Sequence, residues 1–161
     1  QKLMSVILNI SRTYYKPIQT YTNLFAAGAS EKENLAYLLG GCIISFIAQW
    51  PAQSRQAFIN QQPVDELMGA ILLSNLFLLP LIFYLISAVI TIFARIVGSK
   101  ISGAELRLII FWAYLATTPI LLFVGLVEGF FGKNYQYFMV AALWFSVFLA
   151  FVYSGFRGRS R

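Results

Sequence analysis

Four long stretches without a charged residue dominate this sequence: residues 35–54, 67–94, 108–127 and 134–156. An α-helix rises ~1.5 Å per residue and the hydrocarbon core of a bilayer is ~30 Å thick, so ~20 apolar residues can cross it. Each stretch reaches that length. Apolar residues follow one another directly instead of alternating, which disfavours the strands of a membrane barrel. The pattern predicts an all-α, polytopic transmembrane bundle of four membrane-spanning helices.

The composition supports a membrane protein over a soluble domain. Of the 161 residues, 59% are hydrophobic and only 11% are charged, whereas about a quarter of the residues in a soluble domain are charged. The net charge of +6 could also indicate nucleic-acid binding. The basic residues lie at the ends of the apolar stretches, however, as they do in membrane proteins. We therefore expect no nucleic-acid partner.

Local signals predict where the helices begin and end. Ser30 and Glu33 form one capping-box pattern and Ser102 and Glu105 form another, so both serines are expected to begin helices. Pro51 is expected to end the first span, because proline cannot continue a helix without losing a hydrogen bond. The predicted transmembrane domain covers residues 30–156, with spans at about 31–50, 64–97, 103–129 and 135–156.

The lysines and arginines predict the orientation. Ten of the twelve fall on one side of the predicted spans, and only Arg55 and Lys133 fall on the other. Because basic loops stay in the cytoplasm, both termini are expected there, including a basic tail at residues 157–161. The expected location is a bacterial inner membrane.

Residues 1–29 are expected to form a separate cytoplasmic segment. The polar residues of its first part, including Lys2, Arg12 and Lys16, gather on one side of a helix that ends at Pro17, which predicts an amphipathic interfacial helix. One interpretation is that this helix lies among anionic lipid headgroups. The other is that it packs on a partner subunit.

The residues needed for common catalytic chemistry are missing from the sequence. It contains no histidine and a single cysteine, Cys42, so the usual general base and metal ligands are lacking. No phosphate-binding loop, zinc-protease motif or nucleophile elbow is present. We expect no enzyme activity, no cofactor and no metal site.

A few residues in the apolar stretches stand out as candidate sites. Gly125 and Gly129 form a GxxxG pattern, which predicts close helix packing within the chain or with another subunit. A second group surrounds two prolines at similar predicted depth and could shape the bundle or line a polar pocket. The second group is Asn75, Pro80, Thr117, Thr118 and Pro119. Glu128, at the end of the third stretch, is either an ion entry point or a carboxylate beside Lys133.

The chain resembles bacterial members of the Yip1 domain family over roughly residues 20–157. The matching stretches are residues 23–39, 46–51, 94–103, 111–119 and 122–129. The resemblance implies an integral membrane protein without established enzymatic activity. Eukaryotic relatives act in vesicle traffic with Rab GTPases and have five spans and a long cytosolic N-terminus, so the four spans predicted here depart from that pattern. The resemblance assigns no residue a role.

Two functions follow as hypotheses. The first is an accessory or assembly subunit, or a membrane-organising factor, that acts through contacts with anionic lipids, other membrane subunits or copies of itself. The second is a small transporter or channel that uses the Pro80 and Pro119 region together with Glu128.

Overall fold

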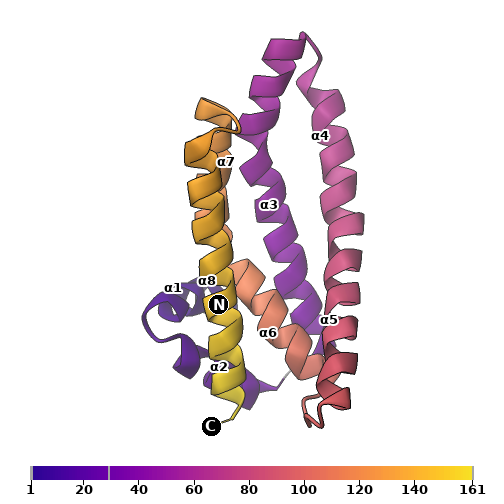
Figure 1. The fold of residues 1–161 in the computed structure, drawn as a ribbon, viewed down its shortest axis with the longest axis vertical. Helices are drawn as coiled ribbons and strands as arrows, with labels where there is room; N and C mark the ends of the chain where they lie inside the picture. Colours follow the sequence, from indigo (N-terminus) through magenta and orange to yellow (C-terminus); the bar gives the residue numbers. More distant parts are fainter. Residues whose placement is uncertain (1, 29, 161) are drawn as a thin grey trace.

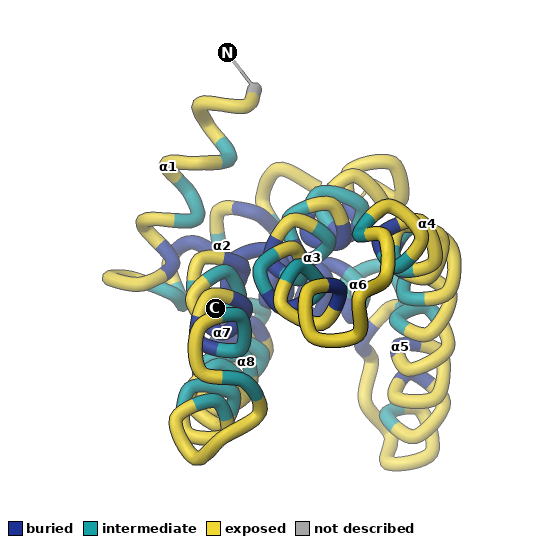
Figure 2. The backbone as a smooth tube through the Cα atoms, turned by 90° about the horizontal axis from the view of Figure 1, so that it is seen from above, coloured by how far each residue is buried: buried dark blue, intermediate teal, exposed yellow. Residues whose placement is uncertain are grey.

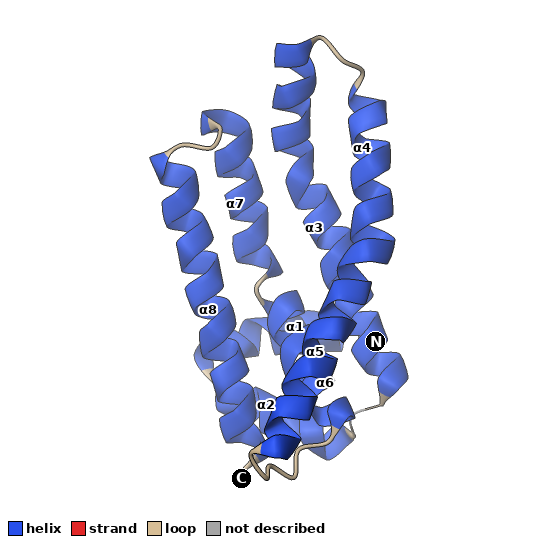
Figure 3. Cartoon of the chain, turned by 45° about the vertical axis from the view of Figure 1, so that its right-hand side comes forward, coloured by secondary structure: helices blue, strands red, loops and turns tan. Residues whose placement is uncertain are grey.

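The computed structural model describes residues 2–28 and 30–160, and every regular element in this part of the chain is a helix (Figure 3). The predicted all-α class is therefore confirmed. The elements are α1 (Lys2–Tyr15), α2 (Pro17–Ala27), α3 (Glu31–Asn60), α4 (Val64–Leu73), the π-helix η1 (Ser74–Leu78), α5 (Leu79–Ile96), α6 (Gly103–Ala116), α7 (Thr118–Phe131) and α8 (Tyr135–Arg159).

Three helices are long and apolar enough to cross a membrane. They are α3, the continuous helix α4–η1–α5 from Val64 to Ile96, and α8. The pair α6 and α7 passes the same test together, but is bent by 46° at its junction. By length and composition the chain therefore has three candidate spans, or four if the bent pair counts as one.

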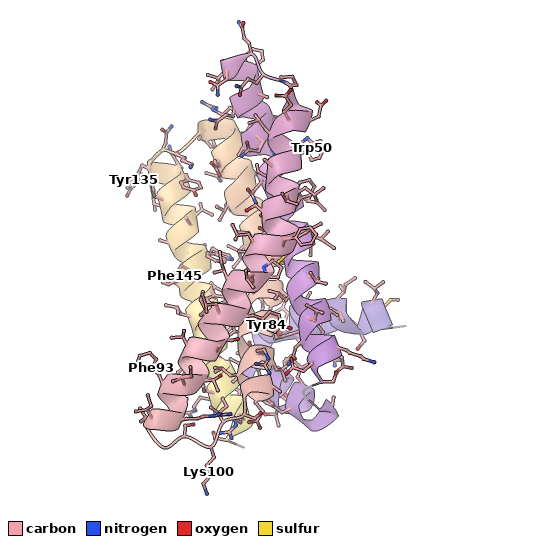
Figure 4. The ribbon with its side chains drawn as sticks, turned by 90° about the vertical axis from the view of Figure 1, so that its right-hand side faces the viewer. Trp50, Tyr84, Phe93, Lys100, Tyr135 and Phe145 are labelled. Atoms are coloured by element: carbon pink, nitrogen blue, oxygen red, sulfur yellow. The ribbon has the colours of Figure 1, made fainter. Side chains whose placement is uncertain are left out.

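The helices form two arms joined by a central pair. Seen from above, α7 and α8 lie on one side, α4 and α5 lie on the other, and α3 and α6 lie between them (Figure 2). The α3–α4 turn marks one end of the molecule, here named the Gln61 end, and the α5–α6 turn marks the opposite Lys100 end (Figure 1). Trp50 and Tyr135 lie towards the Gln61 end, and Phe93 and Phe145 lie on outer, exposed surfaces (Figure 4).

The core is built around α6. Every residue from Leu108 to Ala116 is buried, so this helix is enclosed on all sides, as expected for a helix that is hydrophobic all round. Trp112 meets Tyr37 of α3 edge to face at 5.0 Å between ring centroids, and Phe111 meets Tyr84 of α5 in the same way at 5.0 Å. These contacts join α3 and the α4–α5 arm to the buried helix α6.

The N-terminal segment is part of the bundle, which differs from the separate segment expected from the sequence. Helix α1 stops at Tyr15, and Pro17 begins a second helix that packs along α8. Tyr21 of α2 is fully buried, and it fits because Gly155 and Gly158 bring α8 close. The pattern of residues 1–29 did not reveal this packing, because an apolar side chain suits either lipid or another helix.

The predicted helix starts are right, but the stop at Pro51 is wrong. The Ser30 hydroxyl accepts from the Glu33 amide at 3.3 Å, and Ser102 and Glu105 form a reciprocal capping box. Helix α3 instead continues through Pro51 to Asn60. An interior proline removes one backbone hydrogen bond, and here the packing of its ring on Gly129 offsets part of that cost.

The last helix extends beyond its predicted end at residue 156, because α8 continues to Arg159, while the predicted cytoplasmic tail stays a prediction. The Nε of Arg159 lies 3.1 Å from the carboxylate of Glu105. A second ion pair joins Arg107 of α6 to Glu31 of α3. The two pairs connect the first turns of α3 and α6 with the last turn of α8, so the last residues are held at the Lys100 end of the bundle.

Candidate functional site

Three hydrogen bonds attach the N-terminal helices to α6. The Tyr14 hydroxyl donates to the Ala116 carbonyl at 2.6 Å, and the Tyr21 hydroxyl donates to the Ile109 carbonyl at 3.0 Å. The Trp112 indole donates to the Thr13 hydroxyl at 3.2 Å. Burial raises the pKa of Tyr14 and raises the pKa of Tyr21 further, so both phenols stay protonated and keep donating.

The junction of α6 and α7 is a hydrogen-bonded kink. Pro119 has no amide hydrogen, so the Leu115 carbonyl loses its usual helical partner. The Thr118 hydroxyl replaces that partner and donates to the Leu115 carbonyl at 2.7 Å. The Thr117 hydroxyl donates to two further carbonyls of α6, and Tyr14 reaches the Ala116 carbonyl from outside. These hydrogen bonds lie at the 46° bend between α6 and α7, and the shaping role of these residues stays a prediction.

The GxxxG pattern packs within the chain, which decides between the two interpretations for this contact. A Cβ built on Gly125 would lie 1.8 Å from the Ala48 carbonyl oxygen, and one on Gly129 would lie 2.4 Å from the Pro51 side chain. Helix α7 therefore approaches the backbone of α3 too closely for any side chain at these positions.

The two prolines do not share a pocket. Helix η1 has a π-turn before Pro80, which gives the proline ring room within a continuous helix. Buried Asn75 of η1 faces α3, where its amide donates to the Cys42 carbonyl at 3.4 Å and its oxygen accepts from Gln49 at 3.2 Å. The hydroxyls near Pro119 bond instead to carbonyls of α6.

Glu128 divides two small polar hollows near the Gln61 end. Its carboxylate lies 3.9 Å from the Lys133 ammonium, and both residues line both hollows. One hollow, of about 380 Å³, opens beside Arg55, and the other, of about 320 Å³, reaches Gln49 and Ser45. Gly125 and Ala48, where α7 and α3 come into backbone contact, also line the second hollow. Glu128 lies beside Lys133, and which of its two predicted roles applies stays a prediction.

A larger pocket lies between α1, α2, α3 and α6. It has a volume of about 740 Å³, and most of its wall is apolar. Lys32 and Glu33 lie at one end of it, and Leu115 and Ile44 lie further along the helices. A pocket of this size and character can hold the apolar part of a small ligand. Residues from helices distant in sequence form it, so no local pattern predicted it.

The predicted lipid-contacting residues lie at the turn between α1 and α2. Arg12 and Lys16 line a hollow of about 350 Å³ together with Gln19 and Asn23. These side chains offer positive charge and hydrogen-bond donors, which suits a phosphate group. The side chain of Lys2, the third predicted residue, lies outside the described residues.

Several residues that build these sites were not predicted from the sequence. Tyr14, Tyr21 and Trp112 join α1 and α2 to the core, and Gly40 lines the large pocket. Thr13 belongs to the predicted polar arc of the first helix but is fully buried. The only sequence feature that pointed to a buried role for Thr13 was its hydroxyl on a helix otherwise rich in apolar residues.

Comparisons with family models, with curated proteins and with solved structures find no match. The resemblance to the Yip1 domain family therefore stays a prediction. Within the part of the chain that the structure describes, no three His, Cys, Asp or Glu side chains are grouped to hold a metal ion. Within its described residues the chain is all-helical, and several of its helices are long and apolar enough to span a membrane.

Proposed function

We propose that this chain is a non-catalytic integral membrane protein that acts through lateral contacts. It serves as an accessory or assembly subunit of a larger membrane complex, or as a membrane-organising factor, as its resemblance to the Yip1 family implies. Both termini face the cytoplasm of a bacterial inner membrane in this proposal, because ten of the twelve basic residues belong to that side.

The filled centre of the bundle carries the proposal. Trp112, Phe111 and Ile109 of α6 are fully buried, and side chains from both arms pack around them. A transporter usually places polar or ionisable groups at the middle of the membrane. Around α6, large aromatic and aliphatic side chains fill the centre of the bundle instead, which favours a structural scaffold.

The outer surfaces offer what such a scaffold needs. In α4–η1–α5, only 11% of the most apolar 18-residue window is buried inside the chain, against 33% for α3. Leu81, Leu85 and Phe93 are among its exposed side chains. Lipid tails or the helices of a partner can cover this arm, and the basic hollow at Arg12 and Lys16 adds a contact for anionic headgroups.

Purification in mild detergent tests the proposal. The full chain is expected to elute as a complex with a second membrane protein, with a further copy, or with bound anionic lipid. Mass photometry and lipid mass spectrometry measure these three outcomes directly. A chain that is monomeric and free of lipid under several mild detergents would contradict the proposal.

A second candidate function is a small transporter, which the two polar hollows at Glu128 favour. Glu128 and Lys133 line both hollows, and the second is also lined by Gln49, which donates a hydrogen bond to Asn75. Reconstituted liposomes would then show solute flux that Glu128→Gln abolishes. Equal solute flux in protein-free liposomes, in liposomes with the wild-type chain and in liposomes with Glu128→Gln would eliminate this candidate.

A reporter fusion tests the proposed orientation separately. An alkaline phosphatase domain fused after Arg161 is expected to be inactive, because that enzyme needs the oxidising side of the membrane. The same domain inserted at Gln61 is expected to be active. The reverse result would invert the orientation but leave the fold unchanged.

A further inference from the structure

The large pocket between α1 and α3 follows α3 inward from its first turn. Lys32, Ala36, Gly40 and Ile44 line it at successive turns of one helix face. The twelve residue-to-residue steps from Lys32 to Ile44 rise about 18 Å. One leaflet of a bilayer has a hydrocarbon depth of about 15 Å, half of the whole core. The pocket therefore has the length of one lipid acyl chain.

The walls of this pocket are suited to such a chain. Helix α1 contributes Val6 and Ile10, which are partly buried, and α6 contributes Leu108 and Leu115. The volume of about 740 Å³ falls in the range of ordinary ligand sites. Gly40 keeps the middle of the pocket open, since a Cβ there would meet only the end of the Leu115 side chain, at 3.5 Å.

Two opposite charges stand at the entrance. Lys32 and Glu33 line the same end of the pocket, and both are exposed. Neither takes part in the ion pairs found among the described residues, which join Glu31, Glu105 and Glu128 to other partners. Neighbouring residues on a helix do not face each other. Each charge is therefore available to a ligand.

This arrangement selects one kind of headgroup. Lys32 matches a phosphate, and Glu33 matches a cation that can donate hydrogen bonds. An anionic headgroup without an amine would satisfy Lys32 but lie beside the Glu33 carboxylate. A quaternary ammonium would carry the right charge but has no hydrogen to donate.

We propose that the α1–α3 pocket binds one acyl chain of a zwitterionic aminophospholipid, with its phosphate at Lys32 and its primary ammonium at Glu33. The lipid would fill the space that α1 leaves beside α3, and so would help to hold α1 against the bundle. This site is distinct from the basic hollow at Arg12 and Lys16.

Native mass spectrometry of the delipidated full chain tests the site. Phosphatidylethanolamine, phosphatidylcholine and phosphatidylglycerol with identical acyl chains are added separately at equal concentration. We expect one phosphatidylethanolamine to bind severalfold more tightly than either other lipid. Equal binding of phosphatidylethanolamine and phosphatidylcholine would overturn the proposal, and so would a preference for phosphatidylglycerol.

A matched pair of glycine substitutions tests the pocket. Gly40→Leu places a side chain in the pocket and is expected to weaken phosphatidylethanolamine binding about tenfold, because the space is then overfilled. Gly69→Leu makes the same change at a position where nothing lies within 4 Å, and should leave binding unchanged. Equal binding by both variants would refute the assignment. Thermal unfolding of each variant verifies that it is folded.

Charge variants test the headgroup contacts. Lys32→Gln is expected to weaken binding of all three lipids about two- to fivefold. Glu33→Gln is expected to remove the preference for phosphatidylethanolamine over phosphatidylcholine, while its backbone amide keeps the Ser30 cap. The exposed pair Lys100→Gln and Glu66→Gln serves as the control. A retained preference in Glu33→Gln would contradict its role.

The lipid site deepens the proposed function and rests on only one part of it, namely that the chain is an integral membrane protein. The two can fail separately. A chain that assembles with partners but shows no headgroup preference would overturn this site alone. A monomeric chain that binds phosphatidylethanolamine as described would overturn the assembly role and support the site.

Discussion

Replacing Gly125 by alanine tests the closest helix contact in the molecule. The added Cβ would lie 1.8 Å from the Ala48 carbonyl oxygen and 2.7 Å from its carbon, both backbone atoms that cannot rotate away. Helix α7 must therefore move away from α3. Overpacking of this kind costs about 1–3 kcal/mol. In a chain of this length, 1 kcal/mol shifts the melting temperature by about 2–4 °C, so we expect a decrease of roughly 2–12 °C.

The single cysteine provides the assay. Cys42 is fully buried and is the only thiol in the chain, so a fluorogenic maleimide reacts with it only when the fold opens. Heating purified protein in one detergent with this reagent reports the melting temperature. No added cysteine is needed, and the same measurement applies to each variant.

Gly69→Ala is the matched control. Gly69 lies in the interior of α4 with nothing within 4 Å of a built Cβ, so alanine meets no obstacle there. Because alanine favours helix over glycine, this variant should gain about 0.5–1 kcal/mol, or roughly 1–4 °C. If Gly125→Ala melts at the wild-type temperature or above, the close contact between α3 and α7 is wrong.

Three further variants probe other contacts. Thr118→Val leaves the Leu115 carbonyl without its hydroxyl donor and should cost about 1–3 kcal/mol, which the thiol assay measures; an unchanged melting temperature would contradict the kink. Tyr14→Phe removes the bond to the Ala116 carbonyl, so trypsin should cut at α1 faster than in exposed Tyr15→Phe, and equal cleavage rates would argue against that anchor. Arg107→Gln loses an exposed ion pair and should cost only about 0.2–1 kcal/mol, with the difference shrinking in high salt. If high salt leaves the stability loss of Arg107→Gln unchanged, the ion pair is not screened by solvent as its exposure implies.

Much of the helical architecture follows from the sequence because its causes are local. The apolar stretches predict helices, since a backbone in lipid must satisfy its own hydrogen bonds. Ser30 and Ser102 mark helix starts through bonds to amides three residues away. Thr117 and Thr118 could be linked to Pro119 because hydroxyls compensate for a missing amide within the same turn.

The tertiary structure decided which faces meet. Pro51 lies inside α3 with its side chain against Gly129, and Gly125 contacts α3 of the same chain. Tyr14 and Tyr21 are anchors because they reach carbonyls 102 and 88 residues away in the sequence. Lys32 and Glu33 are the entrance of a pocket only because α1 folds back beside α3. In a membrane, lipid tails and helix surfaces are equally apolar, so hydrophobicity predicts that a helix crosses but not what it touches.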